Sequence, residues 1–234
     1  MIHYNFPITL LKGFTEHENQ GRILDDILFY ATYCKAVTLS GACVDEVEEF
    51  YPDAKYELKW EKGDESKQYK RGSKLYEEHS TSAHCGISHQ MYWRHYNNLK
   101  QGGTISKREL IQLLGFLAAK SILGKNPFKK MTNDFLKARM SGYNKQVDAD
   151  SFPEFISSTM NDYQIRKLKG DLCESWGMVH YSRNMRGFYL GYKNKVTLEA
   201  LALLAERNTR KSKDKIRARK EREAQAEARR RLEF

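Results

Sequence analysis

The sequence lacks the long apolar runs, paired cysteines and phosphate-binding loop that mark several common classes of protein. No stretch approaches the roughly 20 apolar residues of a membrane-spanning helix, and no apolar segment follows a basic start, so we expect no membrane contact and no secretion signal. The four cysteines are scattered without a CxxC pair, which favours reduced thiols and a cytoplasmic location. A GxxxxGK(S/T) loop is missing, which argues against an ATPase.

Patterns that could support metal chemistry are weak. His84, Cys85 and His89 place three potential ligands within six residues, but no second cluster with matching spacing supplies a fourth ligand. Clustered carboxylates could hold magnesium in a nuclease, although acidic residues on exposed helix faces are far commoner. These carboxylates are Asp25, Asp26, Glu46, Glu48 and Glu49. We therefore expect no metal site, no cofactor and no enzymatic activity, with a small metal-dependent nuclease as the weakest alternative.

The positive charge lies in the second half of the chain. The whole protein carries a formal charge of +10. Residues 1–103 have 12 Lys and Arg against 15 Asp and Glu, residues 104–206 have 16 against 10, and residues 207–234 have 12 against 5. A cationic half beside a mildly acidic half indicates a surface for phosphate in the second half.

The first half reads as helix-rich but weakly defined. Apolar residues at helical spacing predict helices over residues 21–37, 43–51 and 88–99. Residues 59–82 are polar and contain two glycines, which predicts a surface loop or an irregular hairpin. The Gln101-Gly102-Gly103 run predicts a boundary.

Sharper signals follow this boundary. Ser106 and Glu109 fit a capping box that opens a buried helix to about Leu123. A short extended piece over residues 127–131 then leads to Thr132, a good N-cap for a helix over 133–140.

The next stretch predicts a helix followed by a β-hairpin. Residues 161–176 place four apolar side chains on one narrow stripe. Residues 178–182 and 187–192 alternate as strands around a cationic tip, and Thr197 caps a last helix. That helix is expected to continue into the basic tail, which can lie along a nucleic-acid backbone or remain a solvated, frayed end.

This order of elements, from Ser106 to Tyr192, resembles the winged-helix superfamily of DNA-binding proteins, including those of phages and mobile elements. The resemblance also rests on the run Trp176-Gly177-Met178-Val179, which feeds Arg186-Gly187-Phe188-Tyr189-Leu190. It implies a mainly α protein with a small β-hairpin (α+β). We expect a helical N-terminal domain over 1–103 for partner contact or self-association, a winged-helix domain over 104–196 and a basic C-terminal helix or tail over 197–234.

We expect the 161–176 helix to enter the major groove of double-stranded DNA, where base edges can be distinguished. Its outward side chains can read bases or hold phosphates, the hairpin tip can grip a groove flank, and the segment before the 133–140 helix can attract phosphate. The predicted nucleic-acid-binding residues are Lys129, Lys130, Thr132, Asn133, Tyr163, Gln164, Arg166, Lys167, Lys169, Arg183, Asn184 and Arg186. Lys169 is assigned to phosphate because it projects nearer the core edge.

One feature departs from the family. The usual helix-turn-helix connection has about 3–4 residues, whereas residues 143–160 intervene here, so residues 152–159 could be the true second helix. The expected function is sequence-specific binding of double-stranded DNA, as a transcriptional regulator or as a replication initiator of a phage or mobile element. The alternative is an RNA-binding or ribosome-associated protein that works through its basic tail.

Overall fold

The computed structural model describes residues 3–16, 20–38, 65–88, 90–91, 94, 106–184 and 187–232. It is mainly helical with two small antiparallel sheets, as the α+β prediction expected. In chain order the N-terminal elements are β1 (His3–Pro7), η1 (Ile8–Leu11), α1 (Lys12–Glu16), α2 (Gln20–Thr38), α5 (Glu65–His79) and β2 (His84–Ser88). The others are α7 (Lys107–Leu123), β3 (Phe128–Met131), α8 (Asn133–Met140), η2 (Ala149–Ser151), α9 (Glu154–Thr159), α10 (Asp162–Ser175), β4 (Met178–Asn184), β5 (Gly187–Tyr192) and α11 (Leu198–Leu232).

The central element is α7, whose apolar residues occupy most of its circumference. The predicted capping box is present, since the Ser106 hydroxyl accepts from the Glu109 amide and the Glu109 carboxylate accepts from the Ser106 amide. The helix ends at Gly124, which has a φ of 56°. Helices α8 and α10 pack against α7 from one part of the chain, and β2 packs against it from another.

A two-stranded sheet in the N-terminal half was not expected from the sequence. Strands β1 and β2 pair antiparallel, with Tyr4 opposite Ile87 and Phe6 opposite Cys85. All four side chains are buried, and they join one hydrophobic core with α7 and β5. The pairing joins segments about eighty residues apart, a kind of contact that local sequence patterns do not encode.

The prediction of a loop or irregular hairpin over residues 59–82 is wrong for the part that the structure describes, because α5 is a helix. Gly72 lets α5 approach α2 closely, since a Cβ at that position would lie 2.7 Å from the Phe29 carbonyl oxygen. The Arg71 guanidinium also donates twice to the Asp26 carboxylate, at 2.9 and 2.8 Å. Tertiary packing on α2 therefore stabilises a helix whose own sequence is polar.

Other N-terminal predictions have mixed outcomes. Helix α2 confirms the helix predicted over residues 21–37. The helix predicted over 43–51 and the boundary at 101–103 lie outside the described residues, as does most of the helix predicted over 88–99. The division of the chain into domains therefore stays a prediction.

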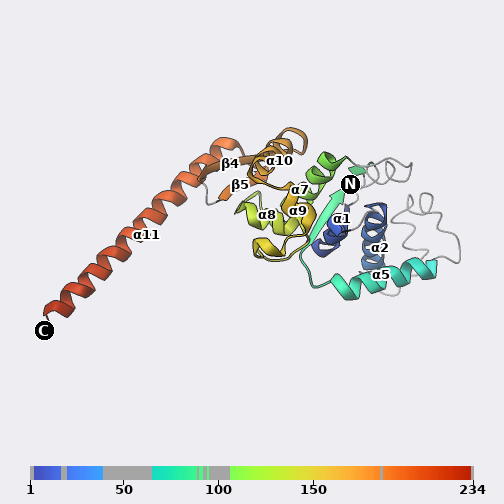
Figure 1. Cartoon of the computed structure of the whole chain (residues 1–234), viewed down its shortest axis with the longest axis horizontal. Coiled ribbons are helices and arrows are strands. Elements are labelled where there is room, and N and C mark those ends of the chain that lie inside the picture. The colour runs from blue at the N-terminus through green and yellow to red at the C-terminus, as the bar shows by residue number, and fades with distance from the viewer. Residues whose placement is uncertain are drawn as a thin grey trace.

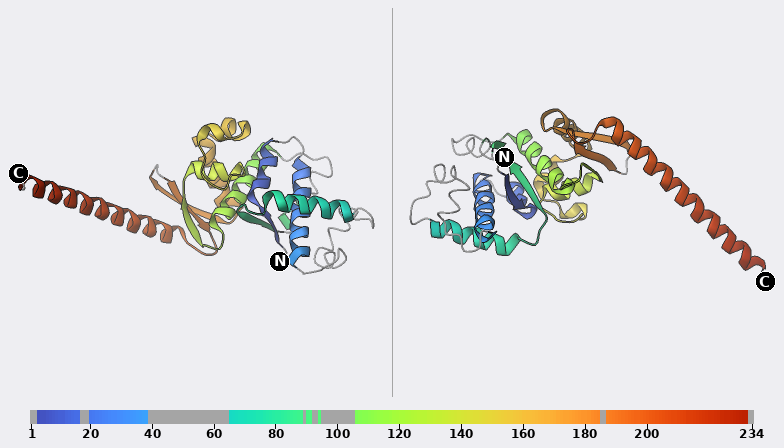
Figure 2. Two further views of the ribbon diagram at one scale, coloured as in Figure 1. Left: turned by 90° about the horizontal axis from the view of Figure 1, so that it is seen from below. Right: turned by 180° about the vertical axis from the view of Figure 1, so that it is seen from behind.

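In the second half the predicted elements are present nearly at their expected bounds. Strands β3, β5 and β4 form one antiparallel sheet in that order, and α11 leaves the body as a long helix at the end that carries this sheet (Figure 1). Helices α2 and α5 lie at the opposite end, and the two further views agree (Figure 2). Among the described helices, none combines the length and apolar character needed to cross a bilayer.

The contact between α7 and α10 generates a stability prediction. A Cβ at Gly115 in α7 would lie 2.7 Å from a methyl carbon of Leu168, a buried side chain of α10. We expect Gly115→Ala to lower the free energy of unfolding by about 1–3 kcal/mol through overpacking. Gly170→Ala is the matched control on α10, because nothing lies within 4 Å of its added Cβ.

The control should raise the free energy of unfolding by about 0.5–1 kcal/mol, the usual gain of alanine over glycine within a helix. Urea denaturation of both variants measures the two effects. Equal stability changes in the two variants would show that α7 and α10 are not in close contact.

Candidate nucleic-acid interface

Helix α10 is fixed to the core by one apolar stripe. Ile165, Leu168 and Leu172 are buried, with 0–2% of their surface exposed. The helix starts at the N-cap Asn161, whose side-chain oxygen accepts from the Gln164 amide at 2.9 Å. Gly177, with a φ of 65°, turns the chain from the end of α10 into β4. The stripe, the N-cap and this turn therefore determine which face of α10 meets solvent.

The solvent-facing side of α10 carries most of the side chains predicted to read DNA. Tyr163 is 63% exposed, Arg166 and Lys167 are exposed, and Gln164 is half-buried on one flank. The Arg166 Nε–H donates to the Asp162 carbonyl oxygen at 3.3 Å, which leaves the terminal nitrogens for other partners. This surface is a convex cationic strip on a rigid helix.

One acidic residue belongs to the same face and was missed in the sequence. Glu174 is exposed one turn beyond Gly170, and by helical spacing it lies between Arg166 and Lys167 around the helix axis. Helical periodicity, at 100° per residue, is enough to place Glu174 on this face from the sequence. A carboxylate here repels phosphate but can accept from the cytosine amino group in a major groove.

A buried carboxylate connects α10 to the start of α7. The Asp171 oxygens accept from the Arg108 guanidinium at 3.0 Å and from the Gln112 side-chain nitrogen at 2.9 Å. The Gln112 side-chain oxygen accepts from the Trp176 indole at 3.4 Å. Burial alone favours the neutral acid, but the bonds from Arg108 and Gln112 outweigh it and lower the pKa of Asp171 below its ordinary value.

A polar cleft of 420 Å³ lies along this junction. Gln164 and Lys167 line it from α10, while Lys107 and Arg108 line it from the first turn of α7. Lys107 was not predicted as a binding residue, because only the folded chain brings the start of α7 beside α10. Its exposed ammonium group enlarges the cationic surface next to Lys167.

Lys169 lies away from this surface, and we remove it from the candidate interface. Only 7% of the residue is exposed, and its Nζ donates to the Asn133 side-chain oxygen at 2.9 Å. The ammonium also lies 3.8 Å from the centre of the Phe188 ring, a cation–π geometry. Burial lowers the pKa of Lys169. Its position on the core edge was predicted, but the assignment to phosphate does not fit a side chain that fastens α8 to α10.

The polar groups at the start of α8 are also engaged internally. The Thr132 hydroxyl accepts from the Phe135 amide at 3.1 Å, which confirms it as the N-cap, and Asn133 bonds to Lys169. By contrast, the β3 side chains of Lys129 and Lys130 are exposed. Of the four residues predicted to bind phosphate in this segment, Lys129 and Lys130 are the two whose side chains are exposed and available to a polyanion.

The sheet brings Lys130 to the hairpin. A Cβ at Gly187 would lie 3.7 Å from the Lys130 side chain, and Gly187 follows directly on the hairpin tip. Arg183 and Asn184 lie at the end of β4, with their side chains outside the described part of the structure. Arg186 is also outside it. The predicted residues thus fall into two groups, one on α10 and one on β3 and the hairpin.

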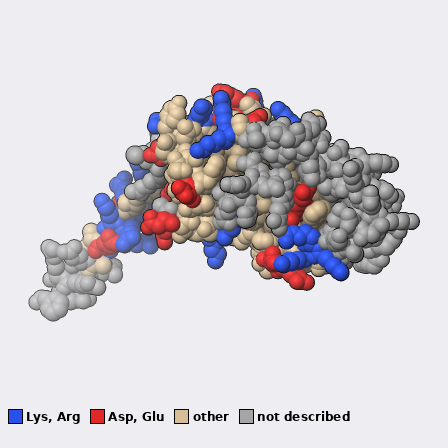
Figure 3. All heavy atoms as spheres, turned by 45° about the vertical axis from the view of Figure 1, so that its right-hand side comes forward, with Lys and Arg blue, Asp and Glu red and all other residues tan. Residues whose placement is uncertain are grey.

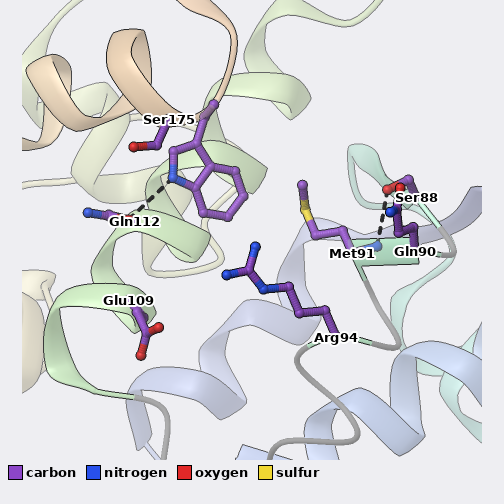
Figure 4. A pocket seen from close by; sticks show the side chains of 8 residues that line it. Ser88, Gln90, Met91, Arg94, Glu109, Gln112 and Ser175 are labelled. Carbon is purple, nitrogen blue, oxygen red and sulfur yellow. Dashed lines mark hydrogen bonds between the residues drawn. The ribbon is translucent and has the colours of Figure 1, made fainter.

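A second pocket, of 560 Å³, separates α7 from the residues after β2. Figure 4 shows Arg94 reaching into this pocket while Glu109 and Gln112 face it from α7. Gln112 therefore contacts the pocket on one side and Asp171 on the other. A change in this pocket that displaces Gln112 therefore also alters its hydrogen bond to Asp171 on α10.

The histidine–cysteine segment considered for a metal lies in β2. The His84 ring bonds to the Tyr30 hydroxyl at 2.8 Å and to the Ser82 carbonyl at 2.9 Å, whereas Cys85 is buried. Burial raises the pKa of the Cys85 thiol to about 12. The bonds of His84 and the burial of Cys85 are those of residues that stabilise the fold. His89 lies outside the described residues.

Comparisons of the chain with protein-family models, with curated proteins and with solved structures give no match. The geometry of α10, its flanking cations and the sheet is therefore the basis for a functional proposal.

The Asp171 junction predicts a specific acid sensitivity. A carboxylate with a lowered pKa stabilises the folded state above the pKa of the unfolded chain, and this contribution is lost as the pH falls through the folded pKa. We expect Asp171→Asn to lower the denaturant midpoint at pH 7, with the gap to the wild type closing as the pH falls below the ordinary pKa of an aspartate and through the lowered pKa of Asp171.

Glu174→Gln serves as the control, because Glu174 is an exposed carboxylate on the same helix. Its midpoint at pH 7 should match that of the wild type, because Glu174 is not one of the residues that make the Asp171 junction. A gap for Asp171→Asn that persists unchanged in acid would refute the ionised junction.

Proposed function

We propose that residues 106–192 form a winged-helix domain and that the protein binds double-stranded DNA with α10 in the major groove. Two features of the fold support this proposal. The elements run helix α7, strand β3, helices α8 to α10 and hairpin β4–β5, and the sheet order is β3–β5–β4. The core of a protein–protein interface is depleted in charged residues, whereas the open face of α10 is polar and cationic.

The observation that carries the proposal is the sidedness of α10. Its apolar stripe is fully covered, while Arg166 and Lys167 stand in solvent. A helix of this diameter fits a B-form major groove, where arginine and lysine can donate to the guanine edge. Because Gly170 has no side chain, the helix backbone at the middle of the open face can approach the bases closely.

The connection before α10 favours the arrangement in which residues 152–159 form the helix that precedes the reading helix. Helix α9 ends at Thr159 and α10 begins at Asp162. The connection of two residues is much closer to the roughly 3–4 residues of a helix-turn-helix than the long segment between α8 and α10 is. Helix α8 is instead tied to α10 through the bond between Asn133 and Lys169. We therefore assign α9 as the helix that precedes the reading helix and α8 as its support.

The domain fits either a transcriptional regulator or a replication initiator acting in the cytoplasm. The pocket beside Gln112 favours a regulated protein, because its lining touches the residue that holds Asp171 on α10. Direct repeats among selected binding sites would favour an initiator, whereas a palindrome would favour a dimeric regulator. Enrichment of RNA alone would favour the alternative of an RNA-binding protein.

The first functional test uses duplexes selected from a random pool. We expect Arg166→Ala and Lys167→Ala each to reduce the preference for a selected duplex over random DNA by about 1–3 kcal/mol, through loss of base contacts. Lys70→Ala, an exposed lysine on α5 at the far end of the molecule, should leave that preference unchanged. Undiminished preference in both α10 variants would remove α10 as the reading element.

A second test uses salt. Phosphate contacts release counterions, so the logarithm of the binding constant should fall linearly with the logarithm of salt concentration, by about 0.9 for each phosphate contacted. Fluorescence anisotropy with the wild-type protein measures this slope. A binding constant independent of salt would contradict an interface made of lysine and arginine.

A further inference from the structure

Helix α11 has two distinct parts, of which the first belongs to the fold. Leu201 and Ala205 are buried in a small apolar cluster with Tyr189 and Val196. The Asn208 side-chain nitrogen donates to the Tyr189 hydroxyl at 2.9 Å. The start of α11 is therefore packed on the β4–β5 hairpin, beside the proposed DNA-binding surface.

The second part has no core of its own. Every side chain described from residue 210 to residue 226 is exposed, and Ile216 is the one large apolar residue among them. Pairing with a second helix needs apolar residues repeated at heptad spacing. This part of α11 offers no such stripe, so what it can offer to another molecule is charge.

The charges are arranged unequally around the helix. At 100° per residue, Arg207, Lys211, Lys215 and Arg222 fall within an arc of about 80°. No acidic side chain lies inside that arc, and none of these four cations makes an ion pair with another described residue. We call these four residues the α11 stripe.

The remainder of the helix surface mixes both signs. Arg217 bonds to Glu221 at 2.9 Å, and Arg219 bonds to Glu223 at 2.7 Å. These pairs stabilise the exposed helix and neutralise its other sides. Lys and Arg gather over the described part of α11 in the face that Figure 3 shows.

We propose that the α11 stripe is a second, sequence-independent contact with the phosphate backbone of the duplex bound by α10; this inference rests on the proposed function. From Lys211 to Arg222 the stripe runs about 16 Å along a straight helix, the length of about five phosphates on one strand. The stripe neighbours the face by which α11 docks on the β4–β5 hairpin, turned from it by roughly 90°. Because the cations of the α11 stripe lie at regular positions on a straight helix next to the hairpin, they match the regular phosphates of a duplex better than those of a folded RNA.

Two triple variants of the full chain, each with three cations removed, test this contact. The stripe variant is Lys211→Gln, Lys215→Gln, Arg222→Gln, and the control is Arg210→Gln, Lys213→Gln, Lys220→Gln on the mixed side. Both keep the ion pairs of Arg217 and Arg219, and glutamine preserves helix propensity. Anisotropy is measured with a random-sequence duplex, the selected duplex and single-stranded and duplex RNA of equal length, over a salt series.

We expect the stripe variant to lower the salt slope on the random duplex by about 2–3, and the control to lower it by less than about 1. The ratio of affinities for the selected and random duplexes should stay unchanged, because that ratio belongs to α10. Equal effects of the two triples, no effect of either, or a loss confined to RNA would overturn the inference. Failure of the proposed function would show differently, as a selected-to-random ratio that Arg166→Ala and Lys167→Ala leave intact.

Discussion

Burial of α7 is the constraint on which the rest of the structure depends. Its leucines, alanines and Phe116 are covered by elements from both halves of the chain, including β2 and α10. The glycine at position 115 allows Leu168 to lie against the α7 backbone, which sets the distance between the two helices. Because α10 is fixed on this side by its apolar stripe, its opposite side must face solvent. The cationic surface is thus a consequence of how the core is packed.

The polar contacts around α10 then determine its rotation and position. Asp171 connects it to Arg108 and Gln112 on α7, and Lys169 connects it to Asn133 on α8. Each contact places a charge out of water, where an unpaired partner is costly. Such contacts favour one orientation of α10 over neighbouring ones, which is what reading base edges requires of a helix. Cations that make these contacts, such as Lys169, stabilise the fold, whereas exposed cations such as Arg166 and Lys167 are available to bind phosphate.

Much of the second half could be predicted from the sequence because its signals are local. The capping box at Ser106, the N-cap at Thr132 and the alternation of the hairpin depend on residues a few positions apart. The β1–β2 sheet and α5 could not be predicted in this way. The sheet joins distant segments, and α5 depends on Gly72 and Arg71 meeting α2.

The candidate site shows the same division. The open face of α10 follows from helical periodicity, so Arg166 and Lys167 were found correctly as exposed side chains. The assignment of Lys169 to phosphate failed because the charge of a lysine says nothing about a ring and an amide brought near it by other elements. Lys107 was missed for the converse reason, since only the fold sets it beside α10.

The central claim is that the open face of α10 lies against duplex DNA. Cross-linking from a photoreactive phenylalanine analogue placed at Tyr163 tests it directly, because this aromatic side chain is 63% exposed on that face. Tyr76 on α5, 36% exposed at the other end of the molecule, is the matched position. The account predicts a covalent adduct with the selected duplex from position 163 and none from position 76. An adduct from position 76 alone would contradict it.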